Sequence, residues 1–316
     1  MCLPSLIQQL IWCAHKHENP DSKRYVLYHS GDASVHRTYY VIRINQPICG
    51  LASFESIIAC YCAHAEKRGF LPIVDLQNLP TMYHEAEEVG KINIWERYYE
   101  QPEGLSLMDT STAKKVIFGD YSNPRTHLVR FWYMDNPLNR NKYARYYRKY
   151  IRINEKMRQI VDRTAEELGF NEGQRILGVV ARGTDYRALK PVLHAVVPSD
   201  DKMILRTREV MLAQKCTRLF LATEDLDILE AFQRAFPEKL VFTNQKRFRT
   251  QEKQMIAHYA SDRPNDRYLR GEEYLTVLEL LARCDCLIGV GCNAFYGAAA
   301  RKECWEYIEQ FDEGRY

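Results

Sequence analysis

The chain has 316 residues and a formal net charge of +3 at pH 7; 46% of its residues are hydrophobic and 27% are charged. This length allows two domains of ordinary size, and the composition is that of a soluble globular protein with a sizeable core. The net charge is too small to indicate a nucleic-acid partner. The 21 tyrosines, together with the arginines, favour a polar-aromatic surface that would suit sugars or bases, or plain packing.

The first apolar stretch, residues 3–14, contains two glutamines and has no basic leader. It is a poor signal peptide and is too short to cross a bilayer. No later stretch is long enough to cross one. We therefore expect a cytoplasmic protein, which leaves contact with a membrane surface open.

Ten cysteines are scattered along the chain, and four of them form two C-x-C pairs, Cys60/Cys62 and Cys284/Cys286. Neither pair has the spacing of a zinc knuckle. The first pair also falls in a predicted helix, where residues two apart do not face each other. The pattern favours reduced thiols in the core, and no metal site is predicted.

The first half of the chain begins with a predicted strand over residues 39–44. A helix is predicted over residues 53–67, with Ser53 as its cap and Gly69 as its stop. A strand over residues 71–76 completes one βαβ unit.

Two further segments of the first half are less regular. Residues 93–104, NIWERYYEQPEG, fit neither a helix nor a strand, and residues 115–118 predict another short strand. Residues 139–163 predict one long helix that is dense in Arg, Lys and Tyr. This helix presents either a solvated basic face or a patch that docks on anionic lipid head groups or on an anionic acceptor. The domain junction is predicted near residue 165, between domains 1–165 and 166–316.

The second half alternates between apolar strands and helices. The strands are predicted at residues 176–181, 219–222, 240–242 and 286–289, and the helices at residues 200–214, 226–236, 272–283 and 294–302. This alternation predicts a doubly wound parallel sheet. Two α/β, Rossmann-like domains that face each other across a cleft would suit an enzyme that uses a nucleotide-sugar.

Three of these strands end in polar or glycine-rich segments. They are Arg182 to Arg187, Thr223 to Asp225, and Gly289 to Asn293. Ligands of open α/β sheets bind at the carboxyl edge, so neighbouring strands would bring the three segments into one crevice. The arginine fork of Arg182 suits a diphosphate, and the glycines and Asn293 would open an anion-binding helix. A structural ion pair between Arg182 and Asp185 is the alternative.

Asp225, Leu226 and Asp227 form a D-x-D sequence, which holds a divalent metal in many glycosyltransferases. Both carboxylates stand at the start of a predicted helix, where they oppose the positive end of its dipole. The position favours helix capping over metal binding.

Together these segments resemble the fucosyltransferase superfamily of GT-B fold, which includes the nodulation fucosyltransferase, the core α1,6-fucosyltransferases and the protein O-fucosyltransferases. The R-G-T-D-Y motif at Arg182 to Tyr186 is followed by Lys190-Pro191, His194 and Pro198, as in bacterial polysaccharide-type relatives. The stretch from Asn93 to Pro102 matches their N-A-W-E-Y-x-x-E-Q-P motif. The resemblance runs from about residue 39 to residue 300.

The resemblance implies an inverting, metal-independent enzyme with a nucleotide-sugar donor in the C-terminal domain and an acceptor-side N-terminal domain, to which the last helix can return. It implies GDP-fucose as the first candidate donor, a glycan or glycolipid acceptor, and no cofactor. The implied donor-binding residues are Arg182, Gly183, Tyr186, Thr223, Glu224, Asp225, Gly291, Cys292 and Asn293. The implied acceptor-binding residues are Asn93, Trp95, Glu96 and Glu100.

The chain also departs from the family pattern. Val180 stands where some members have a histidine near the base, and Val277 stands where an acidic residue often reads guanine. Glu273 and Glu279 are near that position but out of register. A UDP-sugar or another nucleotide-sugar therefore stays open as donor. The catalytic base of the core fucosyltransferases cannot be transferred, because Tyr186 and Lys190 replace their Lys and Glu.

An inverting transfer needs a group that stabilises the leaving diphosphate and a base that deprotonates the acceptor hydroxyl. Arg182 is the candidate for the first role, and Lys190 could assist it. Asp185, His194, Glu96 and Glu100 are the candidates for the base. Trp95 could stack on a sugar ring or lie in the core. Another enzyme class on a similar scaffold, and an inactive nucleotide- or glycan-binding protein, are the alternative functions.

Overall fold

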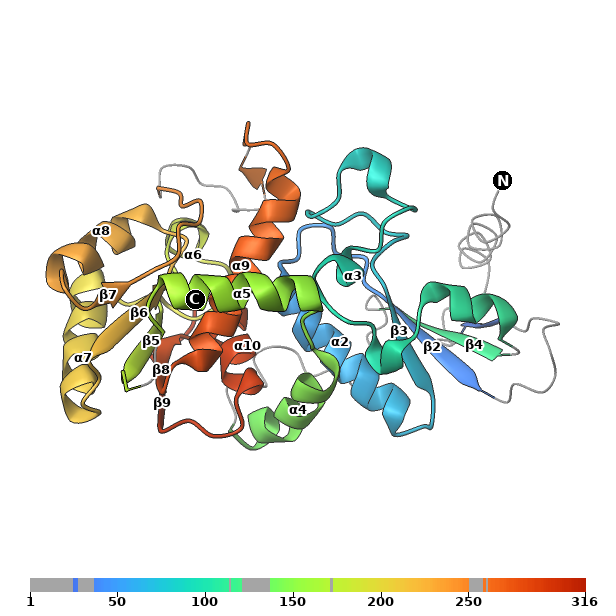
Figure 1. Ribbon diagram of the computed structural model, residues 1–316, viewed down its shortest axis with the longest axis horizontal. Coiled ribbons are helices and arrows are strands. Elements are labelled where there is room, and N and C mark those ends of the chain that lie inside the picture. Colours follow the sequence, from blue (N-terminus) through green and yellow to red (C-terminus); the bar gives the residue numbers. More distant parts are fainter. Residues whose placement is uncertain are drawn as a thin grey trace.

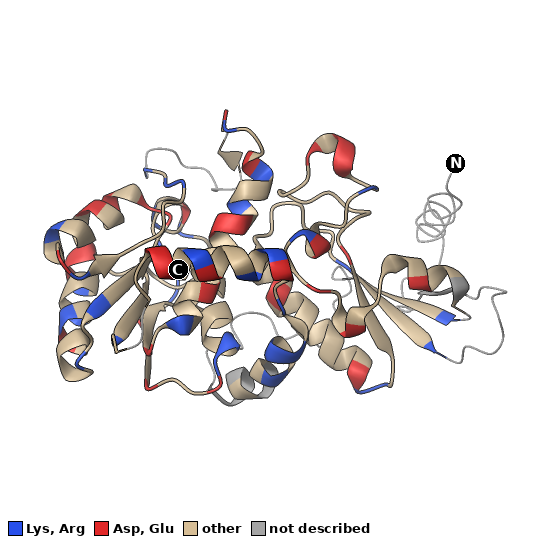
Figure 2. Cartoon of the chain, in the orientation of Figure 1, with Lys and Arg blue, Asp and Glu red and all other residues tan. Residues whose placement is uncertain are grey.

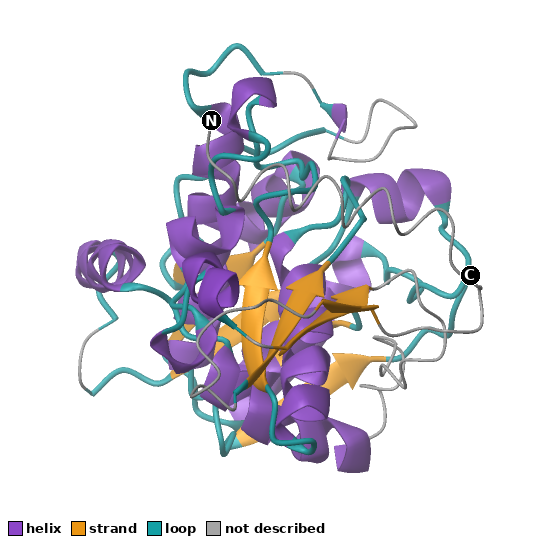
Figure 3. Cartoon of the chain, turned by 90° about the vertical axis from the view of Figure 1, so that its right-hand side faces the viewer, coloured by secondary structure: helices purple, strands orange, loops and turns teal. Residues whose placement is uncertain are grey.

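The computed structural model describes residues 25–27, 37–113, 115–120, 137–170, 173–249, 258–259 and 261–316. The described chain forms two separate β-sheets, one from each half of the sequence, with helices packed around them (Figures 1 and 3). The expected α/β fold with two sheets is confirmed. The prediction for residues 3–14 lies outside the described residues.

The first sheet has the strand order β1-β4-β2-β3. The parallel strands are β2 (Thr38–Arg43), β3 (Leu71–Asp75) and β4 (Lys115–Asp120), and β1 (Tyr25–Leu27) pairs antiparallel with β4. The three parallel strands lie close to their predicted positions. At the carboxyl ends of β2 and β3, Arg43 donates to the buried Asp75 over 2.6 Å.

Helix α2 (Leu51–Glu66) connects β2 with β3 and is buried along most of its length, Cys60 and Cys62 included. The predicted cap Ser53 is wrong, because the helix begins at Leu51 with Gly50 as its N-cap. Gly69 follows the helix with a φ of 68°, a conformation that favours glycine.

Short helices fill the region between β3 and β4. They are η1 (Ala86–Glu88), α3 (Ile94–Tyr98), η2 (Pro102–Gly104) and η3 (Leu107–Thr112). The stretch 93–104, whose sequence fits neither regular pattern, contains α3 and η2. Short helices of this kind carry too few residues to show a periodicity.

The second sheet has five parallel strands in the order β7-β6-β5-β8-β9. Its strands are β5 (Ile176–Val180), β6 (Arg218–Ala222), β7 (Leu240–Val241), β8 (Cys286–Val290) and β9 (Tyr307–Phe311). From β5 the chain adds β6 and then β7 on one side of the sheet, and then β8 and β9 on the other side. This is the doubly wound arrangement that the sequence predicts. Strand β9 was not predicted, because its residues are only partly buried.

Six helices belong to the second half in sequence. They are α5 (Glu155–Glu167), α6 (Thr184–Leu189), α7 (Asp200–Ala213), α8 (Leu226–Ala235), α9 (Asp266–Arg283) and α10 (Asn293–Arg301). Helix α9 begins six residues before the predicted start and rises between the two halves (Figure 1).

The single helix predicted over residues 139–163 is wrong. Helix α4 (Pro137–Tyr150) ends before Ile151, and α5 begins after Asn154, whose side chain caps it by accepting from the amide of Met157 over 3.0 Å. Between the two helices, Ile153 forms a β-bridge with Tyr99. These non-local hydrogen bonds replace those of a continuous helix.

Helix α10 packs against α2 and α4 of the first half, as well as against α9. A buried ion pair supports this contact: Arg301 of α10 binds Glu55 of α2, and it also donates to Glu279 of α9 over 2.6 Å. The last helix therefore contacts the first half of the chain. The domain junction near residue 165 stays a prediction. Within the described residues, each helix is too short or too polar to span a membrane.

Candidate functional site

The three polar segments predicted to converge lie side by side. Strand β5 is hydrogen-bonded to β6 on one side and to β8 on the other. Arg182, Thr223 and Gly291 thus follow three adjacent strands at the same edge of the sheet. This edge includes the point between β5 and β8 where the winding direction reverses, which is where open α/β sheets bind ligands.

Arg182 is held by two carboxylates rather than one. Its guanidinium donates to Oδ1 of Asp185 over 2.7 Å and lies 3.1 Å from Oε2 of Glu224. Burial alone would lower the pKa of Arg182, but Glu224 and Asp185 outweigh it and raise the pKa, so the side chain stays charged. The ion pair with Asp185 is therefore real, and it leaves further N–H groups of the same fork for a ligand.

The turn after Arg182 is fixed by the segment after β6. The amide of Gly183 donates to Glu224 over 2.9 Å, and the amide of Thr184 donates to Oδ2 of Asp225 over 2.8 Å. A Cβ at Gly183 would lie 2.2 Å from Asp225 Oδ2, so only glycine fits there. The protein's own carboxylates thus occupy the first amides of α6.

The D-x-D carboxylates have partners within the protein. Oδ1 of Asp225 accepts from the amides of Asp227 and Ile228 over 2.9 and 3.2 Å, which confirms the predicted capping of α8. The amide of Asp225 in turn donates to the hydroxyl of Thr223 over 3.1 Å. Asp227 pairs with Arg249. Within the described ranges, His, Cys, Asp and Glu side chains do not gather into a group that could hold a metal ion.

The start of α10 also differs from its prediction. The N-cap is Cys292, which makes no side-chain capping bond, and Asn293 is the first helical residue. The amide group of Asn293 instead donates to the hydroxyl of Ser53 over 2.7 Å, which joins the two halves. Close packing explains Gly291, because a Cβ there would lie 2.5 Å from Gln310. Because the N-cap residue is a cysteine, the first amides of α10 have no side-chain oxygen as a cap.

The rings of Tyr186 and His194 pack next to each other beside Arg182. The guanidinium carbon of Arg182 lies 4.8 Å from the centroid of the Tyr186 ring, and the His194 ring packs edge-on against the same ring at 5.0 Å. Burial lowers the pKa of His194, and the charge of Arg182 lowers it further, so His194 is neutral at pH 7. Lys190 is exposed at the end of α6 in a left-handed conformation, with a φ of 45°.

One cation at this edge was missed by the sequence analysis. Arg247 follows β7 and donates to the carbonyls of Gln245 and Thr243 over 3.1 and 2.9 Å, and its Nε is buried without a hydrogen-bond partner. Burial lowers the pKa of Arg247 to about 10, against the opposing effects of Glu224 and Glu273. The residue lies in an irregular loop, where neither spacing nor a motif could indicate it.

Two predicted acceptor residues are structural. Trp95 is fully buried, stacks on Tyr99 with ring centroids 3.9 Å apart and donates to the carbonyl of Glu100. A fully buried ring cannot stack on a sugar, so Trp95 is a core residue, which was the other possibility that the sequence left open. Asn93 is also buried: it accepts from the amides of Leu76 and Trp95 and donates to the carbonyl of Val74. It fixes α3 against β3.

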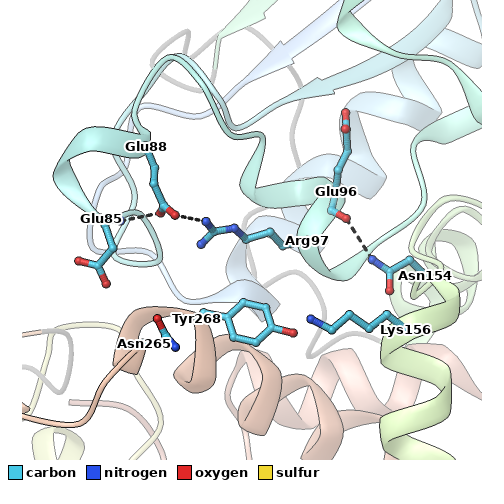
Figure 4. Close-up of a pocket in the computed structure, with 8 residues that line it drawn as sticks. All are labelled: Glu85, Glu88, Glu96, Arg97, Asn154, Lys156, Asn265 and Tyr268. Atoms are coloured by element: carbon cyan, nitrogen blue, oxygen red, sulfur yellow. Dashed lines mark hydrogen bonds and ion pairs between the residues drawn. The ribbon is translucent and has the colours of Figure 1, made fainter.

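The two glutamates of that stretch point to different places. Glu96 lines a cavity of about 440 Å³ between the two halves, but its carboxylate points away from Tyr268 and Lys156 (Figure 4). It accepts from Asn93 over 3.1 Å and from Gln101 over 2.8 Å. Glu100 pairs with two arginines of the α4–α5 junction, Arg152 and Arg158, at 3.1 and 3.3 Å. The hydrogen bonds and ion pairs of these two glutamates are thus made with residues other than Arg182.

The cavity itself is lined by polar groups from both halves. Arg97 pairs with Glu88 on one side, and on the other Lys156 lies 4.6 Å from the centroid of the Tyr268 ring (Figure 4). The side chain of Asn154, which also lines the cavity, donates to the carbonyl of Glu96 over 3.0 Å. Amphipathic rings flanked by charged and amide groups are suited to hydroxyl-rich ligands.

Neither a protein-family model nor a curated protein sequence matches the chain. Its structure, however, is similar to solved fucosyltransferases. The NodZ alpha-1,6-fucosyltransferase soaked with GDP-fucose is 15% identical, with a TM-score of 0.55, over 88% of this chain and 96% of that one. The fucosyltransferase NodZ from Bradyrhizobium in its Se-Met form gives 15% and a TM-score of 0.52, over 88% and 96%. POFUT1 in complex with GDP-fucose gives 11% and 0.52, over 89% and 99%. The chain therefore has the GT-B fold of these fucosyltransferases.

Proposed function

We propose that the protein is an inverting glycosyltransferase that moves a sugar from a nucleotide-sugar to a glycan hydroxyl without a metal ion. The observation that carries the proposal is the edge formed by β6, β5 and β8, where Arg182 stands beside the uncapped start of α10. An arginine fork and helix amides together stabilise a leaving diphosphate. The fold that the chain shares with fucosyltransferases supports the same conclusion.

The donor's charge requires more than Arg182. Its single positive charge is already opposed by Asp185 and Glu224, and Asp225 adds a further carboxylate at the same turn. A diphosphate brings additional negative charge to this edge. Arg247 can balance it, because its guanidinium donates to the carbonyls of Gln245 and Thr243, its Nε is buried without a hydrogen-bond partner, and it follows β7, two strands from β5. We assign Arg247 to the donor site on this ground.

His194 is the best-supported base. Its neutral imidazole is ready to accept the proton of an acceptor hydroxyl, and it stands against Tyr186 beside Arg182. Asp185 is then a positioning residue, because its carboxylate holds the Arg182 fork. Glu96 and Glu100 are less suitable, since their carboxylates bind other groups of the protein. Lys190 remains a candidate to assist at the phosphates.

Fucose from GDP-fucose is the first candidate for the donor, because several of the similar structures were solved with GDP or GDP-fucose. The positions that would read guanine give no support for that base. Val180 and Val277 are 3% and 5% exposed and belong to the core, and Glu273 is paired with Arg263. A UDP-sugar is therefore the alternative donor. The cavity beside Tyr268 is the proposed place for the acceptor glycan.

The experiment that tests this function measures thermal unfolding and donor turnover together. The purified protein is heated with GDP, UDP or ADP, each with EDTA, and the hydrolysis of the matching nucleotide-sugars is then followed. One nucleotide should raise the melting temperature with EDTA present, and its sugar derivative should be turned over. A protein that binds the nucleotide without any turnover would be a binding protein on this fold, and one that binds none of the three would refute the proposal.

A further inference from the structure

A second cavity lies at the junction of α4 and α5. Lys and Arg mark much of the described part of α4, whereas α5 carries both signs of charge (Figure 2). Its volume is about 260 Å³. Four arginines line it, together with two isoleucines and one carboxylate, that of Glu279. The arginines are Arg148, Arg152, Arg158 and Arg301. This concentration of guanidinium groups is not used by the proposed transfer reaction.

The break between the two helices is what brings the arginines together. Arg148 stands in the last turn of α4, Arg152 in the extended segment after it, and Arg158 in the first turns of α5. In one continuous helix, Arg148 and Arg158 would lie about 15 Å apart along the axis. The cap at Asn154 and the bridge from Ile153 to Tyr99 instead turn the chain so that both border one cavity.

The protein's own carboxylates do not fully engage these arginines at the rim. Arg152 and Arg158 share the single carboxylate of Glu100, at 3.1 and 3.3 Å. Arg158 also pairs with Glu155, whose side chain is 67% exposed.

Arg148 has an even weaker ion pair, whereas the innermost arginine has two carboxylate partners. Arg148 lies 3.8 Å from the carboxylate of Glu303, which is 81% exposed. Exposed pairs of this kind contribute little and are exchanged easily. The deepest arginine, Arg301, forms ion pairs with Glu55 and Glu279 and lies at the bottom of the cavity.

We propose that this cavity binds a phosphate group, either of a free phosphate compound or of an anionic lipid head group. A phosphate offers three or more oxygens and close to two negative charges, so it can engage two or three arginine forks at once. The carboxylate of Glu100 already engages two of the arginines, and a phosphate has the additional oxygens and charge to engage a third. The cavity is large enough for a phosphate or a diphosphate but smaller than a typical pocket for a drug-sized ligand.

This site is separate from the donor edge. Asn293 begins α10 at the donor edge and Arg301 ends the same helix at the cavity, about 12 Å further along its axis. The inference therefore does not depend on the proposed transfer reaction.

The test uses the full-length protein and inorganic pyrophosphate, measured by isothermal titration calorimetry. The double variant Arg148→Gln/Arg152→Gln removes two rim charges, while Arg145→Gln is the matched control. Arg145 lies on the same helix, is 69% exposed and pairs with Glu66. We expect pyrophosphate to bind the wild-type protein and the control alike, and the double variant at least tenfold more weakly. Melting curves of all three proteins show that they fold.

A flotation assay distinguishes the two sources of phosphate. It compares vesicles of phosphatidylcholine with vesicles that also contain phosphatidylglycerol. Binding of the anionic vesicles that is lost in the double variant assigns the cavity to a lipid head group, and binding of pyrophosphate alone assigns it to a free compound. The inference is overturned if neither ligand binds the wild-type protein, or if Arg145→Gln weakens binding as much as the double variant.

Discussion

The side-chain amide of Asn293 donates a hydrogen bond to the hydroxyl of Ser53, 2.7 Å away. This bond joins the first residue of α10, the helix that follows β8, to the first turn of α2, the helix that follows β2. The amide oxygen of Asn293 is buried without a hydrogen-bond partner. A buried acceptor in that state costs stability until a donor reaches it.

The first prediction concerns this bond between the halves. We expect Asn293→Ala and Ser53→Ala to show a coupling free energy of about 0.5 to 1.5 kcal/mol in a double-mutant cycle, the usual net value of one hydrogen bond. Urea unfolding of the four proteins measures it. Additive effects of the two substitutions would show that the bond contributes nothing.

The second prediction concerns Arg182. Its replacement by alanine removes the fork that faces the leaving group, so we expect the transfer rate to fall by about 10² or more. Arg249→Ala serves as the control, because Arg249 pairs with Asp227 and Glu230 at the surface, and neither of these is assigned to the donor site. Initial rates at saturating donor decide the matter, and a near-normal rate in Arg182→Ala would remove Arg182 from the mechanism.

The third prediction separates the phosphate-binding role of Arg247 from base recognition. We expect Arg247→Gln to weaken binding of the preferred nucleoside diphosphate about tenfold, the loss of one charge-assisted contact, while the affinity for the parent nucleoside is unchanged. Calorimetry with both compounds measures this difference. Equal losses for diphosphate and nucleoside would place Arg247 at the base instead, and unchanged affinities would remove it from the donor site.

The fourth prediction concerns the pH dependence that His194 imposes. Its pKa lies below the ordinary value of 6.5, mainly because of burial and then because of Arg182. If His194 is the base, kcat/KM is constant above about pH 6.5 and declines as the pH falls through the lowered pKa. His194→Gln should abolish this acid limb, whereas His64→Gln should keep it. An unaltered limb in His194→Gln would assign it to another group.

The lowered pKa of His194 also makes the stability of the folded protein depend on pH. Because the unfolded chain protonates His194 more readily than the folded protein does, its contribution to stability is present above about pH 6.5. It is lost as the pH falls through the lowered pKa. Unfolding at several pH values, with and without His194→Gln, measures the contribution.

The fifth prediction concerns the buried pair between the halves. Glu55 is fully buried and accepts from Tyr99, Tyr147 and Arg301. Replacement of Arg301 by methionine leaves the buried carboxylate of Glu55 without its cation. We therefore expect a loss of about 3 to 5 kcal/mol in the free energy of unfolding.

An exposed pair provides the comparison for Arg301. Arg283 binds Asp162 at the surface, and its replacement by methionine should cost less than about 1 kcal/mol. Denaturant titration of both variants tests the contrast. Equal effects would mean that burial does not strengthen the Arg301 pair.

The sequence alone predicted the order of most strands and helices in the second half, but not α6 and β9, and the position of its polar strand ends. Apolar runs that stop at Arg182 and Thr223 are local signals, and parallel strands carry such residues to one edge whatever the rest of the chain does. The same holds for the cap at Asp225, because its carboxylate reaches amides only two and three residues away.

Only the tertiary structure decided which of these residues are available for chemistry. Trp95 matches a motif but lies in the core, and Arg182 is shared between Asp185 and Glu224, which no spacing could reveal. The break at Ile151 and the cavity beside it depend on hydrogen bonds from residues about fifty positions earlier. Periodicity reports what each residue prefers among its neighbours in sequence, whereas burial and charge pairing are set by neighbours in space.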